Sequence, residues 1–214
     1  MFLFLFHLFI QFMKKTILFS LLLLGFSGVK AQDKWELKRN EAGIEVYTKK
    51  SPIGNLKELR VVCVLDATKE QLITTLQDIP NYNQWVFSNK KSVILKAISP
   101  QKIIYYTESN LPWPIKDRDL VVELDISDTP DVLNIQAKSL PDYLPKKNKF
   151  IRVPYSLATW KVTPIASNKL KVDYTFSVDP GGSIPVWLVN ATLAIGPYNS
   201  FAKLRDVLRL KYQK

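Results

Sequence analysis

Histidine and cysteine, two side chains often used in nucleophilic catalysis and metal binding, are scarce in this sequence. The only histidine is His7, and the only cysteine is Cys63, which lies in an apolar run at residues 61–65. A thiol in such a run is expected to be buried and inert. One cysteine cannot form an intramolecular disulfide. Neither a metal-binding motif nor a phosphate-binding loop is present, so we expect no cofactor.

The N-terminal segment, which contains His7, has the pattern of a secretory signal peptide. Two lysines precede an apolar run at residues 16–29, and the small residues Val29 and Ala31 stand at positions −3 and −1 of a cleavage site. The run is short for a membrane span of about 20 residues, but an uncleaved N-terminal anchor is the alternative.

Cleavage would divide the chain into a signal peptide, residues 1–31, and a mature domain, residues 32–214. Met13 is an alternative start, because the residues before it are almost wholly apolar. The mature chain would have no histidine, which excludes Ser-His-Asp and Cys-His catalysis and histidine-ligated metal sites. It would keep 27 basic and 19 acidic residues, a net charge of +8. We expect it to be periplasmic or extracellular.

A stiff aromatic corner lies in the middle of the chain. Pro112 and Pro114 fix φ on either side of Trp113, so the loop presents one large ring. Such a ring suits the mouth of a lipid site, where it can touch a bilayer interface, although packing beneath a loop is the alternative. We assign Trp113 as a gate and membrane contact.

The charged pair Arg118–Asp119 follows this corner. A buried arginine requires a carboxylate or a ligand oxygen, because an unpaired buried charge is costly. Asp117, Asp119 and Glu123 are the local partners. Arg118 therefore either binds a ligand or forms a structural ion pair.

The spacing of apolar residues predicts the elements that position these side chains. A helix with its N-cap at residues 66–68 ends before Pro80, and a helical turn follows at 81–87. Short links between most strands indicate an antiparallel meander. Residues 33–40 predict a short helix, and strands are predicted at 44–47, 56–65, 92–98, 102–108, 119–127, 132–138, 155–163 and 170–178.

A long helix is predicted at residues 184–212, about 43 Å at 1.5 Å per residue. Gly196 and Pro197 should kink or split it. Its wide apolar stripe must be covered. We therefore predict an α+β fold, in which a strongly curved antiparallel sheet grips the C-terminal helix and leaves a hydrophobic cavity against it.

Four motifs occur in order along the mature chain. The first is Trp35 before Gly-Ile-Glu-Val-Tyr at residues 43–47, and the second is Tyr82 with Trp85. The third is Leu-Pro-Trp-Pro followed by Arg-Asp at residues 111–119, and the fourth is Asp-Pro-Gly-Gly followed by Ile-Pro-Val-Trp-Leu-Val-Asn at residues 179–190. In these the sequence resembles the START lipid-transfer domains of the helix-grip superfamily. The resemblance covers essentially the whole mature chain. It implies a curved antiparallel sheet, a C-terminal helix that acts as a lid, and a tunnel for one lipid or other hydrophobic ligand.

Candidate ligand-binding residues are large, mostly aromatic side chains, and ordinary core packing is the alternative for each. Asn190 is the most informative, because a polar group on a buried helix stripe needs a partner. The candidates are Trp85, Tyr105, Tyr106, Arg118, Trp160, Phe176, Trp187 and Asn190.

These features predict a monomeric, non-catalytic protein that binds and transfers a lipid or other hydrophobic molecule. A charge of +8 suits transient docking on anionic membranes, at roughly 1 kcal/mol for each basic residue near the surface. The basic loop at residues 141–148 either touches such a surface or is a solvated turn. The alternative is a cyclase or hydrolase on the same fold, with Asp, Glu, Tyr or Lys as acid and base. No nucleic-acid-binding motif is present.

Overall fold

The computed structural model describes residues 34–50, 57–111, 113, 115–182, 184 and 195–212. The predicted cleavage site therefore lies outside the described residues. The elements are β1 (Glu36–Glu41), β2 (Ile44–Lys50), β3 (Lys57–Leu65), α2 (Lys69–Gln77), η1 (Ile79–Gln84), β4 (Asn89–Ser99), β5 (Lys102–Ser109), β6 (Arg118–Asp128), β7 (Leu133–Ser139), β8 (Ile151–Arg152), β9 (Tyr155–Ala166), β10 (Lys169–Asp179) and α4 (Ile195–Tyr212).

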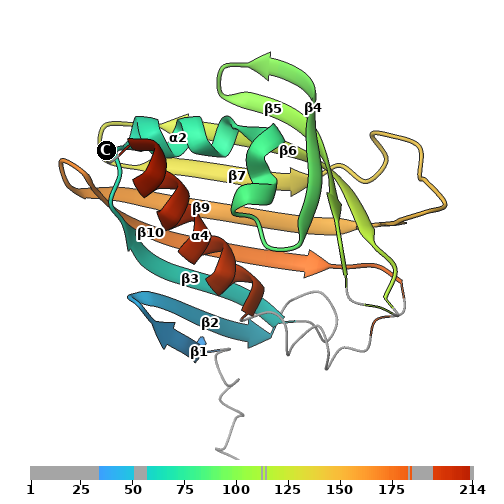
Figure 1. Ribbon diagram of the computed structural model, residues 1–214, viewed down its shortest axis with the longest axis horizontal. Coiled ribbons are helices and arrows are strands. Elements are labelled where there is room, and N and C mark those ends of the chain that lie inside the picture. The colour runs from blue at the N-terminus through green and yellow to red at the C-terminus, as the bar shows by residue number, and fades with distance from the viewer. Residues whose placement is uncertain are drawn as a thin grey trace, which may run out of the picture. The chain divides into compact units, whose positions relative to one another are not determined.

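All the described strands belong to one curved sheet, whose order is β1-β2-β3-β10-β9-β7-β6-β5-β4 (Figure 1). After β3 the chain crosses through α2 and η1 to the far edge at β4, and then returns strand by strand until β10 pairs with β3. Every pairing is antiparallel except that of the short β8 with β6. The predicted α+β fold with a curved antiparallel sheet is confirmed.

Helix α2 begins where the sequence predicts. The side chain of Thr68 accepts a hydrogen bond from the backbone of Gln71, and the Gln71 side chain accepts one from the backbone of Thr68. This capping box satisfies backbone groups that the first helical turn leaves free. Leu72 and Leu76 are buried on one side of the helix. Pro80 then lies at the start of the 3₁₀ helix η1.

The short helix predicted at residues 33–40 is wrong, because Glu36–Glu41 is the edge strand β1. This strand pairs with β2 from Glu36–Thr48 to Glu41–Ile44. The link is a tight turn in which Ala42 and Gly43 both have positive φ. Pairing with β2 therefore overrides the weak local preference for helix.

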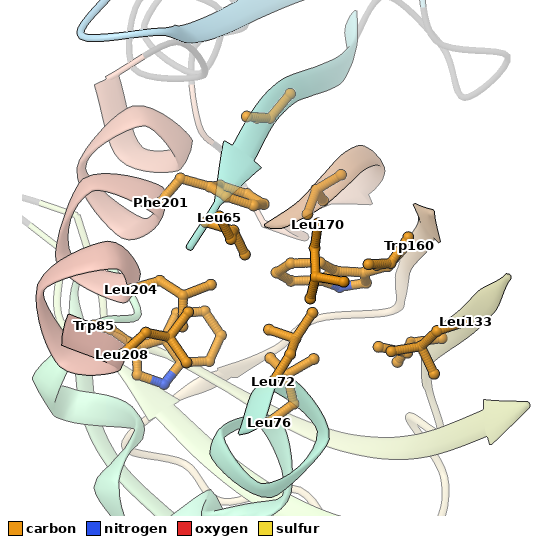
Figure 2. Close-up of a cluster of buried hydrophobic side chains, with 14 of the residues drawn as sticks. Leu65, Leu72, Leu76, Trp85, Leu133, Trp160, Leu170, Phe201, Leu204 and Leu208 are labelled. Carbon is orange, nitrogen blue, oxygen red and sulfur yellow. The ribbon is translucent and has the colours of Figure 1, made fainter. Parts of the chain in front are cut away.

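The core lies between the sheet and its helices. We call the sheet side that carries α2, η1 and α4 the concave face (Figure 1). Helix α4 adds Phe201, Leu204 and Leu208 to the core (Figure 2). No helix among the described residues is long and apolar enough to cross a membrane.

The predicted C-terminal helix is described from Ile195 onward. Ile184 is not helical, and residues 185–194 lie outside the described residues. Pro197 is the third residue of α4 as described, and the predicted kink or split at Gly196 and Pro197 also involves residues outside the described ranges, so it stays a prediction.

Candidate functional site

One group of aromatic rings on the concave face joins η1 to β5. The rings of Tyr82 and Trp85, both at η1, meet edge to face with centroids 5.1 Å apart, and Tyr105 of β5 lies 5.6 Å from Tyr82. All three side chains are buried. The predicted candidates Trp85 and Tyr105 thus belong to one cluster, which also contains Tyr82.

A second aromatic group joins β9, β10 and α4. Trp160 of β9 lies 4.8 Å from Tyr174 of β10 and 5.0 Å from Phe201 of α4, measured between ring centroids. Phe176 stacks on Tyr174 at 6.4 Å. Trp160 and Phe176 are therefore both in the concave face, and Figure 2 shows Trp160 beside Phe201 and Leu170.

The phenols in these groups differ in their hydrogen bonds. The hydroxyl of Tyr82 donates to the carbonyl of Leu76. By contrast, those of Tyr105 and Tyr174 are not bonded to any residue that the structure describes. Burial raises the pKa of all three phenols. Each is therefore neutral at physiological pH and can donate a proton in a hydrogen bond.

Tyr106 points away from this site. Successive side chains in a strand face opposite sides, so Tyr105 and Tyr106 cannot line the same space. Tyr106 packs with Ile104 and Val121 on the other side of the sheet. Its hydroxyl donates to Glu108 at 3.0 Å, and Lys147 Nζ donates to it at 3.1 Å. The structure thus corrects the assignment of Tyr106 to the ligand site.

Arg118 is buried, but it is not paired with Asp119. Its Nε donates to Pro180 O at 3.3 Å, its Nη2 to Gly181 O at 3.1 Å, and its Nη1 to Lys116 O. Among the described residues no carboxylate forms an ion pair with Arg118. It fastens the start of β6 to the Asp-Pro-Gly-Gly loop, and burial lowers its pKa despite the nearby charge of Asp117.

The partner of Asp119 is Arg152 of β8. Nε and Nη2 of Arg152 lie 2.9 and 3.0 Å from the two carboxylate oxygens, and the side chains are 2% and 1% exposed. Arg152 also donates to the carbonyls of Pro141, Leu144 and Pro145. This ion pair therefore organises the basic loop at residues 141–148. Sequence reasoning missed Arg152, which lies 33 residues from its partner.

The described part of α4 is fastened to the sheet by polar contacts as well as by its apolar side. Arg205 donates to the carbonyls of Ala42, Gly43 and Val64. The guanidinium of Arg39 lies 3.5 Å from the centre of the Tyr198 ring. These contacts join both the β1–β2 turn and β1 itself to the helix.

A small polar cluster next to Tyr105 was also missed. Asn89 Nδ2 donates to Ser92 Oγ at 2.9 Å and to Thr107 Oγ1 at 2.7 Å, and Ser92 donates to Thr107 at 2.9 Å. The buried Asn89 Oδ1 has no hydrogen-bond partner among the residues that the structure describes. Thr107 follows Tyr105 by two residues in β5, so strand alternation places both on the concave face.

Three predicted candidates remain: Trp113, Trp187 and Asn190. Trp113 is 93% exposed in the loop between β5 and β6. Trp187 and Asn190 lie outside the described residues, so their roles stay predictions. The enclosed tunnel also stays a prediction. A hollow of about 510 Å³ lies at the start of α2 and the β9–β10 turn, and none of its lining residues belongs to either aromatic group.

Within the described ranges, no group of three or more His, Cys, Asp or Glu side chains could hold a metal ion.

Residues 28–213 match the family model of the START domain. The chain belongs to the START domain family. It is 27% identical over 164 residues to the phosphatidylcholine transfer protein of Mus musculus, covering 73% of this chain and 75% of the relative.

Solved structures agree with this assignment. The START domain is 30% identical to a STAR-related lipid transfer protein of Xanthomonas axonopodis, with a TM-score of 0.76 over 83% of this chain and 99% of the other. It also shares its fold with an aromatase/cyclase of Streptomyces, at 10% identity and a TM-score of 0.50, covering 73% of this chain and 96% of the other. At that identity the likeness concerns the fold alone.

Proposed function

We propose that this START domain binds one lipid against the concave face of its sheet and carries it between membranes without changing it chemically. The observation that carries the proposal is the gathering of aromatic rings from η1, β5, β9, β10 and α4 on the concave face. Aromatic and apolar walls with a few polar groups are typical of small-molecule sites. The similarity to proteins named for lipid transfer supports this choice of ligand.

The charged groups argue for binding rather than catalysis. The carboxylate of Asp119 is held in an ion pair on the opposite face, and that of Glu108 accepts from Tyr106 there. The phenols of the concave face have raised pKa values, so they are poor general bases at neutral pH. A cyclase would need an acid–base pair facing its substrate.

Trp113 is proposed as the membrane contact. An indole that is 93% exposed contributes little to packing, and aromatic rings of this kind partition into the bilayer interface. Lys116, three residues on, is also exposed and can approach anionic headgroups. The loop between β5 and β6 would therefore meet the donor membrane first.

The test is lipid uptake by residues 32–214 from vesicles of phosphatidylcholine with one-fifth phosphatidylglycerol, followed by mass spectrometry of the re-isolated protein. We expect lipid bound in a ratio of about one per chain. Trp113→Ala should lower the uptake rate several-fold but leave the unfolding midpoint unchanged. A folded chain that takes up no lipid would contradict lipid binding. A Trp113→Ala variant that takes up lipid at the wild-type rate would contradict the membrane contact.

We further propose that the protein acts outside the cytoplasm. The support is the N-terminal pattern of two lysines, an apolar run at residues 16–29, and Val29 and Ala31 at the cleavage positions. The intact mass of the protein from its native host should begin at Gln32. A chain that keeps the apolar run would instead be membrane-anchored.

A further inference from the structure

The polar cluster of Asn89, Ser92 and Thr107 has hydrogen-bonding capacity that its own side chains do not use. Asn89 uses both amide protons, which it donates to the hydroxyl oxygens of Ser92 and Thr107 at 2.9 and 2.7 Å. Ser92 donates its own proton to Thr107 at 2.9 Å. The Oδ1 of Asn89 and the hydroxyl proton of Thr107 then have no partner among the described residues. The cluster therefore offers an acceptor and a donor within one hydrogen-bonded unit.

Burial makes these unused groups costly. Ser92 is 4% exposed and Thr107 is 9% exposed, and Asn89 Oδ1 has no contact with solvent. Buried polar atoms are nearly always hydrogen-bonded, because the bonds that they lose with water must be replaced. A partner from outside the chain would complete this network.

The cluster lies at one particular end of the concave face. Thr107 pairs with Leu120 near the end of β5, and the last pair of these two strands is Ser109 with Arg118. Arg118 in turn donates to Pro180 and Gly181, which directly follow β10. The end of β5 that carries the cluster is therefore at the same end of the sheet as the last residues of β10. The loop with Trp113 also begins there, just after β5.

Side chains of the concave face are less buried at this end than at the other. Along β10, Leu170 and Val172 are at most 2% exposed, whereas Tyr174 and Phe176 are only half-buried. At the far end, leucines fill the space between the sheet, α2 and α4 (Figure 2). They are Leu65, Leu72, Leu76, Leu133, Leu170, Leu204 and Leu208. A ligand on the concave face therefore has more accessible surface beside the cluster than at the leucine-filled end.

The unused groups specify the chemistry of the partner. No charged side chain among the described residues is hydrogen-bonded to the cluster. A hydroxyl group can donate to Asn89 and accept from Thr107 at the same time. A phosphate oxygen can only accept, and a quaternary ammonium has no proton to donate, so either would leave Asn89 Oδ1 without a partner.

We propose that Asn89 and Thr107 bind a hydroxyl group of the lipid, which donates to Asn89 Oδ1 and accepts from the Thr107 hydroxyl. Ser92 is a positioning residue that holds the Thr107 oxygen. The site rests on the proposed function, because it needs a lipid on the concave face. The domain would then select lipids by their hydroxyl groups.

The experiment compares lipids that differ only in a hydroxyl. Vesicles of phosphatidylcholine contain one-fifth phosphatidylglycerol or one-fifth phosphatidylpropanol with the same acyl chains, which has the same charge but no headgroup hydroxyl. A second pair of vesicles contains diacylglycerol or its acetyl ester. Wild type should extract the hydroxyl-bearing lipid of at least one pair about five- to tenfold better, since one net hydrogen bond is worth roughly that factor. The pair that wild type discriminates shows whether the hydroxyl belongs to a headgroup or to a neutral lipid.

Two variants remove the two unused groups separately. Asn89→Ala removes the acceptor and leaves the bond from Ser92 to Thr107 in place, whereas Thr107→Val removes the donor and keeps the shape. Both should lose the preference and still extract the lipid without a hydroxyl at the wild-type level. If Thr107→Val does not fold, Asn89→Ala decides. Thr175→Val is the matched control, because it removes a hydroxyl bonded to Thr159 on the opposite face of the sheet, and it should keep the preference.

Each other outcome overturns something definite. Equal uptake within both lipid pairs by wild type would overturn the hydroxyl site and leave lipid binding intact, since water would then complete the cluster. A preference that survives in Asn89→Ala would also overturn the site. A folded wild-type chain that extracts no lipid from any of the vesicles would overturn the proposed function and this site with it.

Discussion

Removal of the Asp119 charge should be among the most destabilising single changes in this domain. In the variant Asp119→Asn the shape is kept, but the guanidinium of Arg152 loses its counter-charge in a place where both side chains are at most 2% exposed. Breaking a buried ion pair by removing one partner costs about 3–5 kcal/mol. For a chain of this length each kcal/mol lowers the midpoint by roughly 2–4 °C, so the expected fall is about 6–20 °C.

The assay is urea and thermal unfolding of residues 32–214, followed by circular dichroism. Arg152→Met should cost at least as much, since it also frees the carbonyls of Pro141, Leu144 and Pro145. Asp206→Asn is the matched control. Its partner Arg209 is one turn away on α4 and both side chains are mostly exposed, so we expect a change below about 0.5 kcal/mol. A loss below about 1 kcal/mol in Asp119→Asn would refute the reasoning.

Three further predictions concern single residues. Burial raises the pKa of the Cys63 thiol to about 11, although Arg205 opposes the shift. The thiol should therefore resist alkylation at pH 8 in the native protein and react fully in urea. Fast labelling of the native protein would contradict its burial. Gly182→Ala should lower the free energy of unfolding by about 1–2 kcal/mol, because φ is +66° and a Cβ would lie 2.8 Å from Ile151 Cδ1. Arg205→Ala should lower the free energy of unfolding by about 1–3 kcal/mol and speed hydrogen exchange in α4, because three backbone carbonyls lose their donor. Unchanged exchange would show that apolar packing alone holds the helix.

Much of the sheet could be predicted because its strands are buried on one side or, in β5, on both. Leu133 and Ile135 recur with a period of two and mark β7, whereas β5 is buried on both faces and appears as the apolar run at residues 103–106. The edge strand β1 gives no such signal, because nearly all of its side chains are exposed. Its structure depends on pairing with β2, which local sequence does not encode.

The candidate site was predictable in part for a related reason. Large aromatic residues on buried strands are visible in the sequence, and Tyr105 and Trp160 do lie in the core of the concave face. Their role in ligand binding stays a prediction. Which of two adjacent tyrosines faces inward depends on strand register, and Tyr106 was therefore misplaced. The pairing of Asp119 with Arg152 depends on a parallel contact of two residues between β6 and β8. No periodicity of the sequence reports such a contact.

The position of β10 has a consequence for the order of folding. Strand β3 pairs with β10 from Leu65–Leu170 to Leu59–Phe176, so about half of the chain separates the partners. Until β10 arrives, the first three strands have no connection to the rest of the sheet. Contacts this distant in sequence slow folding. A chain synthesised from its N-terminus therefore cannot complete the sheet until its last strand is available.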